Sequence, residues 1–369
     1  MNFENIEMGV AVFDDQEKFR NFLSDKEKKH TKRNDVKMKD IRILNIESVD
    51  NYSAKTGLES PIIENFDAVS QNIEYGTQLF VQDGKSVVPV RECALTSIYD
   101  RIGLNGPALE RFSKDDLADI LTKAGHTLPD DMSAKAVVVD DGLNALLSAG
   151  YVPHPASDVF RDTEVAVWGL GDDIVKFSGW YSYEGVVARF ETDRKIKISD
   201  SSECNTVISM STSDIGRAAV SFTAGARDGR YTIPLVNAER VLHKNGSTKE
   251  DIQEKLNMVI ASISKAQAKL DTLKDIQIEY PITTAKRLAK TIKLPKKPAL
   301  IAIERWRIEN EKSAKPVTAF DLYITLCKTE IDYQPRKGKV SYVDKMHNNL
   351  LKLLGMSFKD YDIPGEFNW

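Results

Sequence analysis

The stretch from Asn205 to Asn237, NTVISMSTSDIGRAAVSFTAGARDGRYTIPLVN, constrains the fold more than any other part of the chain. Side chains alternate in type over residues 206–211 and again over 218–222, with the two-residue period of a β-strand. The residue types that favour turns stand between and after these runs, at Ser213, Asp214, Gly216, Gly225, Asp228 and Gly229. The pattern predicts a strand, a corner of small polar residues and a second strand.

The segment ISMSTSDIGRAAVSF in this stretch resembles the signature of a family of phage- and plasmid-borne proteins, domain of unknown function 932. The residues that carry the signature are Ser211, Ser213, Asp214 and Gly216. Three further segments fit in the same order: ALTSIYDRIGLNGPALERF at 94–112, AKAVVVDDGLNALLSAGYVPHPASDVF at 134–160 and VTAFDLYITLCKTEI at 317–331.

This resemblance covers residues 75–335 and implies a phage or mobile-element setting. It implies no particular activity, since the function of the family is not established. Many members follow the glycine-containing strand with a Cys-Asn-Gly turn, where this chain has Arg230-Tyr231-Thr232. Any role of that cysteine is therefore absent here.

The composition is that of an ordinary soluble globular protein, with 41% hydrophobic and 29% charged residues in a chain of 369. No apolar stretch is long enough to cross a bilayer, and the start MNFENIEMGVAVF lacks the features of a secretion signal. We therefore expect a cytoplasmic protein that does not associate with a membrane.

Cysteines and histidines are few and far apart. They are Cys93, Cys204 and Cys327, with His30, His126, His154, His243 and His347. None has the spacing of a zinc site or of a disulfide framework. We expect neither feature, and no cofactor.

Hydrophobic periodicity predicts an α+β fold, in which a mixed or antiparallel sheet is followed by a helix-rich C-terminal half. The predicted divisions are an N-terminal strand and charged arm (1–74), an α+β core (75–246) and a helical region (247–369). Residues 24–42 carry many charges and few apolar anchors, which is typical of a solvated helix or a flexible arm. Asp83-Gly84 between two apolar runs predicts a hairpin.

Residues 95–112 have the apolar spacing of a helix-turn-helix, with Gly103 in the turn and Pro107 at the start of the second helix. Tyr99 stands where close helix packing usually requires alanine, and the second helix carries Glu110 beside Arg111. We therefore predict a packing unit with this shape and no DNA readout.

Two pairs of aspartates follow apolar runs. Asp140-Asp141 come after residues 135–139 and before a segment that we predict to be helical, LNALLSAG, and Asp172-Asp173 come after residues 165–170. Paired carboxylates at strand ends hold Mg²⁺ in several nucleases and polymerases. The same sequences are common in turns and helix caps. Gly169-Leu-Gly171 lacks the third glycine and the helix of a nucleotide loop.

Aromatic and basic residues mix in a strand-like run at 177–190, FSGWYSYEGVVARF. Aromatic rings on a sheet can stack on exposed bases, and they are also a common filling for a core. The alternation places Trp180 and Tyr181 on opposite faces, so at most one of them can meet a ligand.

The strongest helix prediction covers residues 247–276. Ser247 and Glu250 have the spacing of a capping box. The apolar residues that follow repeat in steps of four and three, at Ile252, Leu256, Val259, Ile263, Ala266, Leu270 and Leu273. Such a seam predicts lengthwise packing on another helix, from within the chain or from a second copy in a homo-oligomer.

Basic residues concentrate after Pro281. Residues 286–315 hold ten basic and three acidic side chains in a protein of net charge -4. The candidate nucleic-acid-binding residues are Lys286, Arg287, Lys290, Lys293, Lys296, Lys297, Arg305, Trp306 and Arg307. Leu288 and Ile292 face inward on a helix that Pro295 ends. Several fixed cations beside a planar ring are what binding of a phosphate backbone needs.

We expect a non-enzymatic protein that binds single-stranded DNA in replication or recombination, with Trp306 and Trp180 as stacking residues. A second hypothesis is a phage protein that docks on a host defence protein through an acidic face at residues 110–164, where eleven acidic residues face five basic ones. A third is a metal-dependent nuclease or nucleotidyltransferase that uses the paired aspartates.

The C-terminal tail FKDYDIPGEFNW either binds the body of the protein or binds a partner.

Overall fold

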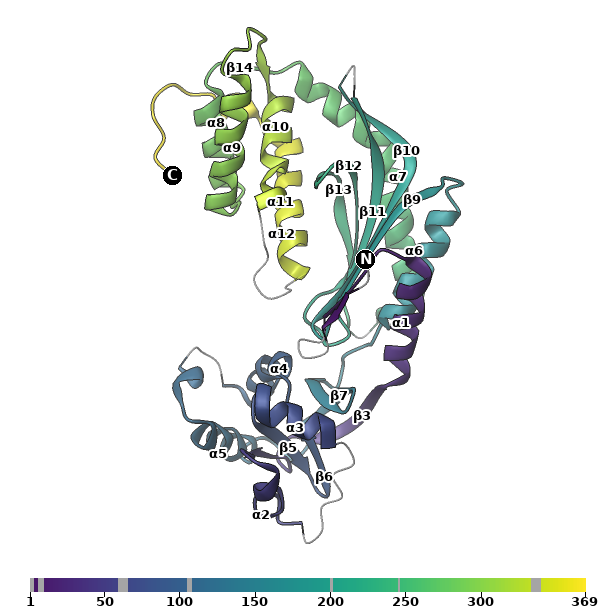
Figure 1. Cartoon of the computed structure of the whole chain (residues 1–369), viewed down its shortest axis with the longest axis vertical. Coiled ribbons are helices and arrows are strands. Elements are labelled where there is room, and N and C mark those ends of the chain that lie inside the picture. The colour runs from purple at the N-terminus through teal and green to yellow at the C-terminus, as the bar shows by residue number, and fades with distance from the viewer. Residues whose placement is uncertain are drawn as a thin grey trace.

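The structure is a computed structural model of the chain, and it describes residues 3–5, 10–58, 66–104, 108–199, 202–244, 246–332 and 340–369. Two lobes lie one above the other (Figure 1). The chain leaves the upper lobe at the end of α1 (Gln16–Lys28), builds the lower lobe, and returns after β8 (Gly142–Ser148). Helices and antiparallel sheets together confirm the predicted α+β class.

A seven-stranded antiparallel sheet forms the centre of the upper lobe. Its strands, in spatial order, are β1 (Phe3–Asn5), β2 (Val10–Phe13), β9 (Ile174–Ser182), β10 (Gly185–Ser199), β11 (Ser202–Thr212), β12 (Val220–Asp228) and β13 (Tyr231–Val241). The strands and the corner predicted between Asn205 and Asn237 are therefore confirmed as β11, a loop and β12, with β13 completing the run.

Helices cover both sides of this sheet (Figure 1). On one side lie α1, α6 (Ala156–Trp168) and α7 (Lys249–Lys274). On the other side is a bundle of α8 (Pro281–Thr291), α9 (Lys296–Asn310), α10 (Ala319–Cys327), α11 (Thr329–Asp332) and α12 (Val340–Leu351). A short two-stranded sheet, β14 (Gln277–Ile278) with β15 (Val317–Thr318), and 3-10 turns at Lys352–Gly355 and Phe358–Tyr361 complete this half.

Helix α7 confirms the predicted seam, since all seven of its apolar seam residues are buried. Its main neighbours are strands β13 and β12, so the seam packs on the sheet rather than on a lengthwise helix partner. The capping box is formed by Thr248 and Asp251, one residue after the predicted pair. The seam residues are covered by strands of the same chain. Self-association through residues 252–273 therefore stays a prediction, and it would have to use another face of α7.

The lower lobe holds two small sheets and four helices. One sheet has the order β3 (His30–Lys37), β7 (Ser133–Val139), β8, and the other has the order β4 (Arg42–Asn45), β5 (Leu79–Asp83), β6 (Ser86–Pro89). The helices are α2 (Tyr52–Thr56), α3 (Phe66–Tyr75), α4 (Glu92–Ile102) and α5 (Lys114–Gly125), with 3-10 turns at Val49–Asn51 and Leu109–Arg111. The predicted boundary after residue 74 falls inside this lobe.

One local prediction was partly wrong here and a second was wrong. In the charged segment 24–42, residues 24–28 are helical as the end of α1, but the segment continues as strand β3 and not as a solvated helix or flexible arm. In the described chain β3 pairs with β7 alone, so its free edge tolerates charge. The segment LNALLSAG is strand β8 and not a helix. Nearly all of β8 is buried, and an apolar run buried on both faces has no period that separates a strand from a helix.

The helical pair predicted at 95–112 is also partly wrong. Helix α4 ends at Gly103, whose φ of 76° suits a C-terminal glycine. The second helix is replaced by the 3-10 turn at Leu109–Arg111, and α5 begins after the capping residue Ser113. Pro107 lies outside the described residues. The hairpin predicted at Asp83-Gly84 is confirmed, with Gly84 and Lys85 in its two-residue turn.

The loop between β11 and β12 joins the two lobes. Ile215 is buried in a cluster with lower-lobe side chains that include Val137, Ala145 and Tyr151. The Tyr151 hydroxyl donates to the carbonyl oxygen of Ser213 at 3.1 Å. Gly216 has a φ of 72°, and a Cβ there would lie 3.2 Å from the Leu147 side chain. A side chain at residue 216 would therefore need a strained backbone and would press on Leu147 at the contact between the lobes.

The same loop is held within the upper lobe as well. The Ser213 hydroxyl donates to the carbonyl oxygen of Glu184 at 2.6 Å, and the Asp214 carboxylate accepts from the Ala156 amide at the start of α6 at 3.1 Å. Arg217 then reaches the lower lobe and donates to the carbonyl oxygen of Cys93 at 2.9 Å. The inter-lobe joint thus contains three of the four signature residues predicted from sequence, Ser213, Asp214 and Gly216. The fourth, Ser211, is buried near the end of strand β11.

A buried ionic cluster fixes the helical bundle on the sheet. The Glu330 carboxylate of α11 accepts from the Thr232 amide at 2.6 Å and lies 3.2 Å from His347 Nε2. Arg189 and Arg227 approach it at 3.7 and 3.8 Å. Burial acts to raise the pKa of Glu330, but the hydrogen bond from His347 and the charges of His347 and Arg189 outweigh it and lower the pKa to about 2.

We predict that this cluster gives the upper lobe an acid-sensitive component of stability. The folded-state pKa lies below the ordinary value of a glutamate, so the contribution is complete above pH 4.5 and is lost as the pH falls toward 2. A pKa difference of this size corresponds to about 3 kcal/mol. Denaturant unfolding of Glu330→Gln across this pH range should show that component missing.

The matched control is Glu74→Gln, since Glu74 is exposed on α3. It should follow the pH dependence of the unchanged protein. An equal loss of acid sensitivity in both variants would show that Glu330 is not the group responsible.

Candidate functional site

The predicted basic residues lie on α8, on α9 and at the corner between them. Leu288 and Ile292 are buried as predicted, which turns Lys286, Arg287 and Lys290 toward the other side of α8. Helix α8 ends at Thr291, before Pro295, which instead precedes α9. Lys293 ends the turn in a left-handed conformation with a φ of 60°.

The residues predicted on the second half of α9 are engaged within the chain. Arg305 pairs with Asp332 at 3.2 Å, and Arg307 pairs with Glu304 at 2.6 Å. Trp306 is half-buried against the core. These three residues therefore do not add to an open cationic surface, and Trp306 does not present a free ring for stacking.

The C-terminal tail lies against α8. Arg287 donates to the carbonyl oxygens of Ile363 at 2.6 Å and Tyr361 at 3.3 Å. The Phe367 ring lies beneath two cations, at 5.6 Å from the Arg287 guanidinium and 5.3 Å from the Lys290 ammonium. The Asp362 carboxylate of the tail also accepts from the amides of Glu279, at 3.0 Å, and Tyr280, at 2.8 Å. Of the two hypotheses for the tail, the structure shows binding to the body.

Four exposed lysines remain at the α8–α9 corner: Lys290, Lys293, Lys296 and Lys297. We call them the corner lysines. Within the described part of the chain, the side chains of the last three make no hydrogen bond or ion pair, and the Lys290 side chain contacts the Phe367 ring. Lys286 is half-buried beside them. The corner is therefore the part of the predicted site that keeps its charge available.

The acidic run at 110–164 does not form one face. Its residues are divided between α5 in the lower lobe, the β7–β8 turn and α6 in the upper lobe. Many are paired with cations from other segments: Asp115 with Lys55, Asp130 with Lys39, Asp140 with Lys26 and Glu164 with Arg20. The negative charge of this run is thus largely neutralised locally.

The two aspartate pairs stay apart. Asp140 and Asp141 form the β7–β8 turn, while Asp172 precedes β9 and binds Arg194 at 2.7 and 3.3 Å. The Asp173 amide donates to Asp193 at 3.1 Å. Among the residues that the structure describes, no group of three or more His, Cys, Asp or Glu side chains is placed to hold a metal ion. The four predicted carboxylates therefore do not form a two-metal site.

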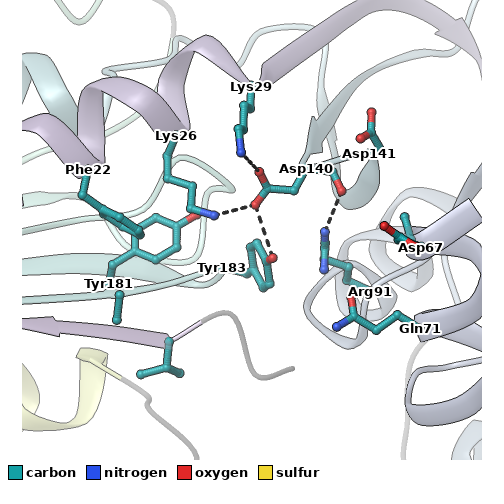
Figure 2. Close-up of a pocket in the computed structure, with 13 residues that line it drawn as sticks. Phe22, Lys26, Lys29, Asp67, Gln71, Arg91, Asp140, Asp141, Tyr181 and Tyr183 are labelled. Carbon is teal, nitrogen blue, oxygen red and sulfur yellow. Dashed lines mark hydrogen bonds and ion pairs between the residues drawn. The ribbon is translucent and has the colours of Figure 1, made fainter. Parts of the chain in front are cut away.

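A pocket between the lobes was not predicted from sequence (Figure 2). Its volume is about 280 Å³. The lining residues come from α1, α3, the β7–β8 turn and strands of the upper sheet, and they are Val10, Ala11, Phe22, Lys26, Lys29, Asp67, Ala68, Gln71, Arg91, Asp140, Asp141, Tyr181 and Tyr183. Ligand sites favour such junctions between structural units.

The Asp140 carboxylate contacts several of the residues that line this pocket (Figure 2). Its carboxylate lies 2.7 Å from Lys26 Nζ and 3.7 Å from Lys29 Nζ, and the Tyr183 hydroxyl lies at 3.4 Å. Burial acts to raise the pKa of Asp140, but the hydrogen bond from Lys26 and the charges of Lys26, Lys29 and Arg91 leave the pKa below its ordinary value. The lobes are thus linked by an ionised carboxylate.

Arg91 forms the opposite wall. Its Nη2 donates to the carbonyl oxygens of Val139 and Asp140, both at 3.0 Å. Its guanidinium carbon lies 3.9 Å from the centre of the Tyr183 ring, as in a cation–π contact. A Cβ on Gly142 would come within 2.4 Å of Arg91 Nε. Glycine at 142 is therefore what allows the guanidinium to lie across the turn.

The sequence pointed to Asp140 and Asp141 as candidate site residues but not to the residues that surround them in the pocket. Lys26 and Lys29 stood in a segment taken for a solvated arm, and Arg91 carried no motif. Trp180 lies on the opposite face of β9 from Tyr181, as the alternation predicted, and is half-buried next to Val12 and Val187 in the sheet register. Tyr181, which is buried, and Tyr183 are the aromatic residues of this run that reach the pocket.

Comparison with family models, with curated proteins and with solved structures found no match. The resemblance to domain of unknown function 932 stays a prediction that depends on the segments quoted above. Within the described residues, no helix combines the length and the apolar character needed to span a bilayer.

We predict that Gly142→Ala disturbs the pocket wall. The added methyl group must displace the Arg91 guanidinium from the turn carbonyls and from the Tyr183 ring, which should lower the free energy of unfolding by about 1–3 kcal/mol. Denaturant unfolding measures this loss. Gly355→Ala is the matched control, because a Cβ there meets nothing within 4 Å and its φ is not positive. Equal effects at both positions would contradict the proposed contact.

Proposed function

We propose that the protein is a non-enzymatic, phage- or mobile-element-encoded protein of the host cytoplasm that binds single-stranded DNA during replication or recombination. The observation that supports this most strongly is the group of corner lysines. Four exposed cations lie within eight residues, and no carboxylate of the described chain pairs with them. The phage setting is supported by the sequence resemblance alone.

Binding at this corner would be electrostatic. Each lysine that neutralises a phosphate releases a condensed counterion, so affinity falls with salt in proportion to the number of contacts. Because Trp306 is half-buried and Phe367 is covered by its two cations, the corner offers no free ring for stacking. We therefore propose binding through the backbone, with little preference for sequence.

The backbone at Lys293 adds to this argument. A left-handed residue at a helix C-terminus is most often glycine, and a lysine there costs about 1 kcal/mol or more. The chain nevertheless places a lysine at this position, at the centre of the corner. A site that keeps a cation at a conformational cost is better explained by a role for the charge than by stability.

The other two hypotheses receive no support from the geometry. An acidic docking face requires the carboxylates of 110–164 to gather, and they are divided between the lobes and paired. A two-metal nuclease requires Asp140, Asp141, Asp172 and Asp173 to converge, and they do not. Docking on a host protein remains a prediction for other surfaces.

We predict salt-sensitive binding of single-stranded DNA. With four phosphate contacts, the logarithm of the binding constant should fall with the logarithm of salt concentration with a slope of about -3. Replacing the four corner lysines with glutamine should bring the slope close to zero. Fluorescence anisotropy of a labelled oligonucleotide over a salt series measures both values.

The control replaces four exposed lysines elsewhere, Lys114, Lys123, Lys176 and Lys265, with glutamine, and it should keep the slope. Lys293→Gly is a sharper variant, because it should raise the free energy of unfolding by about 1 kcal/mol while it reduces the slope by about 0.7. A slope that the corner substitutions leave unchanged would refute binding at this site, and absence of any binding would refute the proposed function.

A further inference from the structure

The inter-lobe pocket has the features of a built ligand site that the proposed DNA binding does not use. Among the described residues, Arg91 Nε and Asp140 Oδ1 are buried there without a hydrogen-bond partner, and Lys29 Nζ lies 3.7 Å from Oδ1. Buried polar atoms in folded proteins are nearly always satisfied, by the protein, by water or by a ligand. Both residues line the cavity, where Arg91 also donates to the carbonyl oxygen of Asp140. Two such atoms beside one cavity indicate that it holds polar groups.

The backbone of the β7–β8 turn carries a conformational cost at the same place. Asp140 and Asp141 have φ angles of 44° and 60°. A two-residue turn of this kind is formed most easily by Asn-Gly or Gly-Gly. Non-glycine residues in the left-handed region cost about 1 kcal/mol or more each, and such residues cluster at binding sites. The turn thus presents two carboxylates in a backbone conformation that glycine adopts more easily.

The charged residues that line the pocket restrict the kinds of ligand that can bind there. The lining includes three cations, Lys26, Lys29 and Arg91, and three carboxylates, Asp67, Asp140 and Asp141. Lys26 and Asp140 neutralise each other at 2.7 Å. Lys29 lies farther from the same carboxylate, at 3.7 Å, and its side chain is exposed. The groups left for a ligand are therefore Arg91 and Lys29 on one hand and the exposed carboxylates of Asp67 and Asp141 on the other. The Asp67 and Asp141 carboxylates make no hydrogen bond or ion pair with the residues that the structure describes.

A balanced pocket of this kind disfavours both a polyanion and a metal cation. A phosphate-rich ligand would meet Asp67 and Asp141, and a divalent ion would meet Lys29 and Arg91. A ligand with one negative and one positive group satisfies both sets at once. Arg91 and Lys29 suit a carboxylate, and the free carboxylates suit an ammonium group.

Apart from Gln71 and the Tyr183 hydroxyl, the rest of the lining is largely apolar. Val10, Ala11 and Ala68 contribute small side chains, and Phe22 and Tyr181 contribute rings. The Lys26 ammonium lies 5.4 Å from the Phe22 ring and 5.9 Å from the Tyr181 ring, which keeps these rings at the cavity. A volume of about 280 Å³ suits a molecule with one ring or a short aliphatic chain.

We propose that this pocket binds a free α-amino acid with an aromatic or large aliphatic side chain. The carboxylate of the ligand is held by Lys29 and Arg91, its ammonium group by Asp141 and Asp67, and its side chain by the apolar part of the lining. Because the walls come from both lobes, the bound amino acid links them. This site is separate from the corner lysines and does not depend on DNA binding.

Isothermal titration of the full chain with phenylalanine and with leucine tests the proposal. At least one of them should bind with a dissociation constant below about 1 mM. Phenylalaninamide lacks the carboxylate and 3-phenylpropionate lacks the ammonium group, so each should bind at least tenfold more weakly. Inorganic phosphate and a nucleoside monophosphate should not bind at the pocket. Tighter binding of the monophosphate than of either amino acid would overturn the charge argument.

Two variants locate the site. Asp141→Asn keeps a residue that tolerates the left-handed turn while it removes one carboxylate, and Lys29→Gln removes one cation. Each should weaken binding about tenfold, the effect of losing one charged hydrogen bond. Asp131→Asn, at an exposed aspartate outside the pocket, should bind as the unchanged protein does. Failure of both amino acids to bind, or binding that neither pocket variant weakens, would overturn the proposal.

Discussion

The contact on which the rest of this structure depends is the insertion of the β11–β12 loop into the lower lobe. Ile215 supplies the apolar part of that contact, and Ser213 and Arg217 supply hydrogen bonds to Tyr151 and Cys93. The Asp214 carboxylate also caps the start of α6, where a negative charge is favoured. One short loop thereby fixes the upper sheet, the helix that follows the lower lobe and the lower lobe itself.

The two proposed sites depend on this joint to different degrees. The pocket has one wall in each lobe, so Asp140 meets Lys26 and Tyr183 only when the lobes are docked. The corner lysines belong to the bundle alone, which is anchored on the sheet by Glu330 and by the Tyr323 hydroxyl that donates to the carbonyl oxygen of Pro234. Loss of the joint should therefore abolish the pocket and leave the basic corner intact.

The sequence predicted the strands around the signature loop and the buried seam of α7, because their apolar residues recur with a regular strand or helix period over many residues. These elements together also predicted the α+β class. Strands β3 and β8 could not be predicted, because their apolar residues do not alternate. Strand β3 lies at a sheet edge and is charged, and strand β8 is buried on both faces. The basic residues on α8 and α9 were predicted from the sequence, but the contacts of Lys290 with Phe367 and of Arg305 with Asp332 were not, because the partners are distant in sequence. The pocket was missed for the same reason, since Lys26, Arg91 and Asp140 meet only through the fold.

The most direct test of the inter-lobe joint is the distance between spin labels placed on the two lobes, at Lys123→Cys on α5 and Lys176→Cys on β9. The native thiols should not react, because all three are buried, and burial raises the pKa of Cys93 to about 12 and that of Cys204 to about 11. If the loop holds the lobes as one body, double electron–electron resonance should give a single narrow distance distribution. A broad distribution or two separate distances would contradict this account.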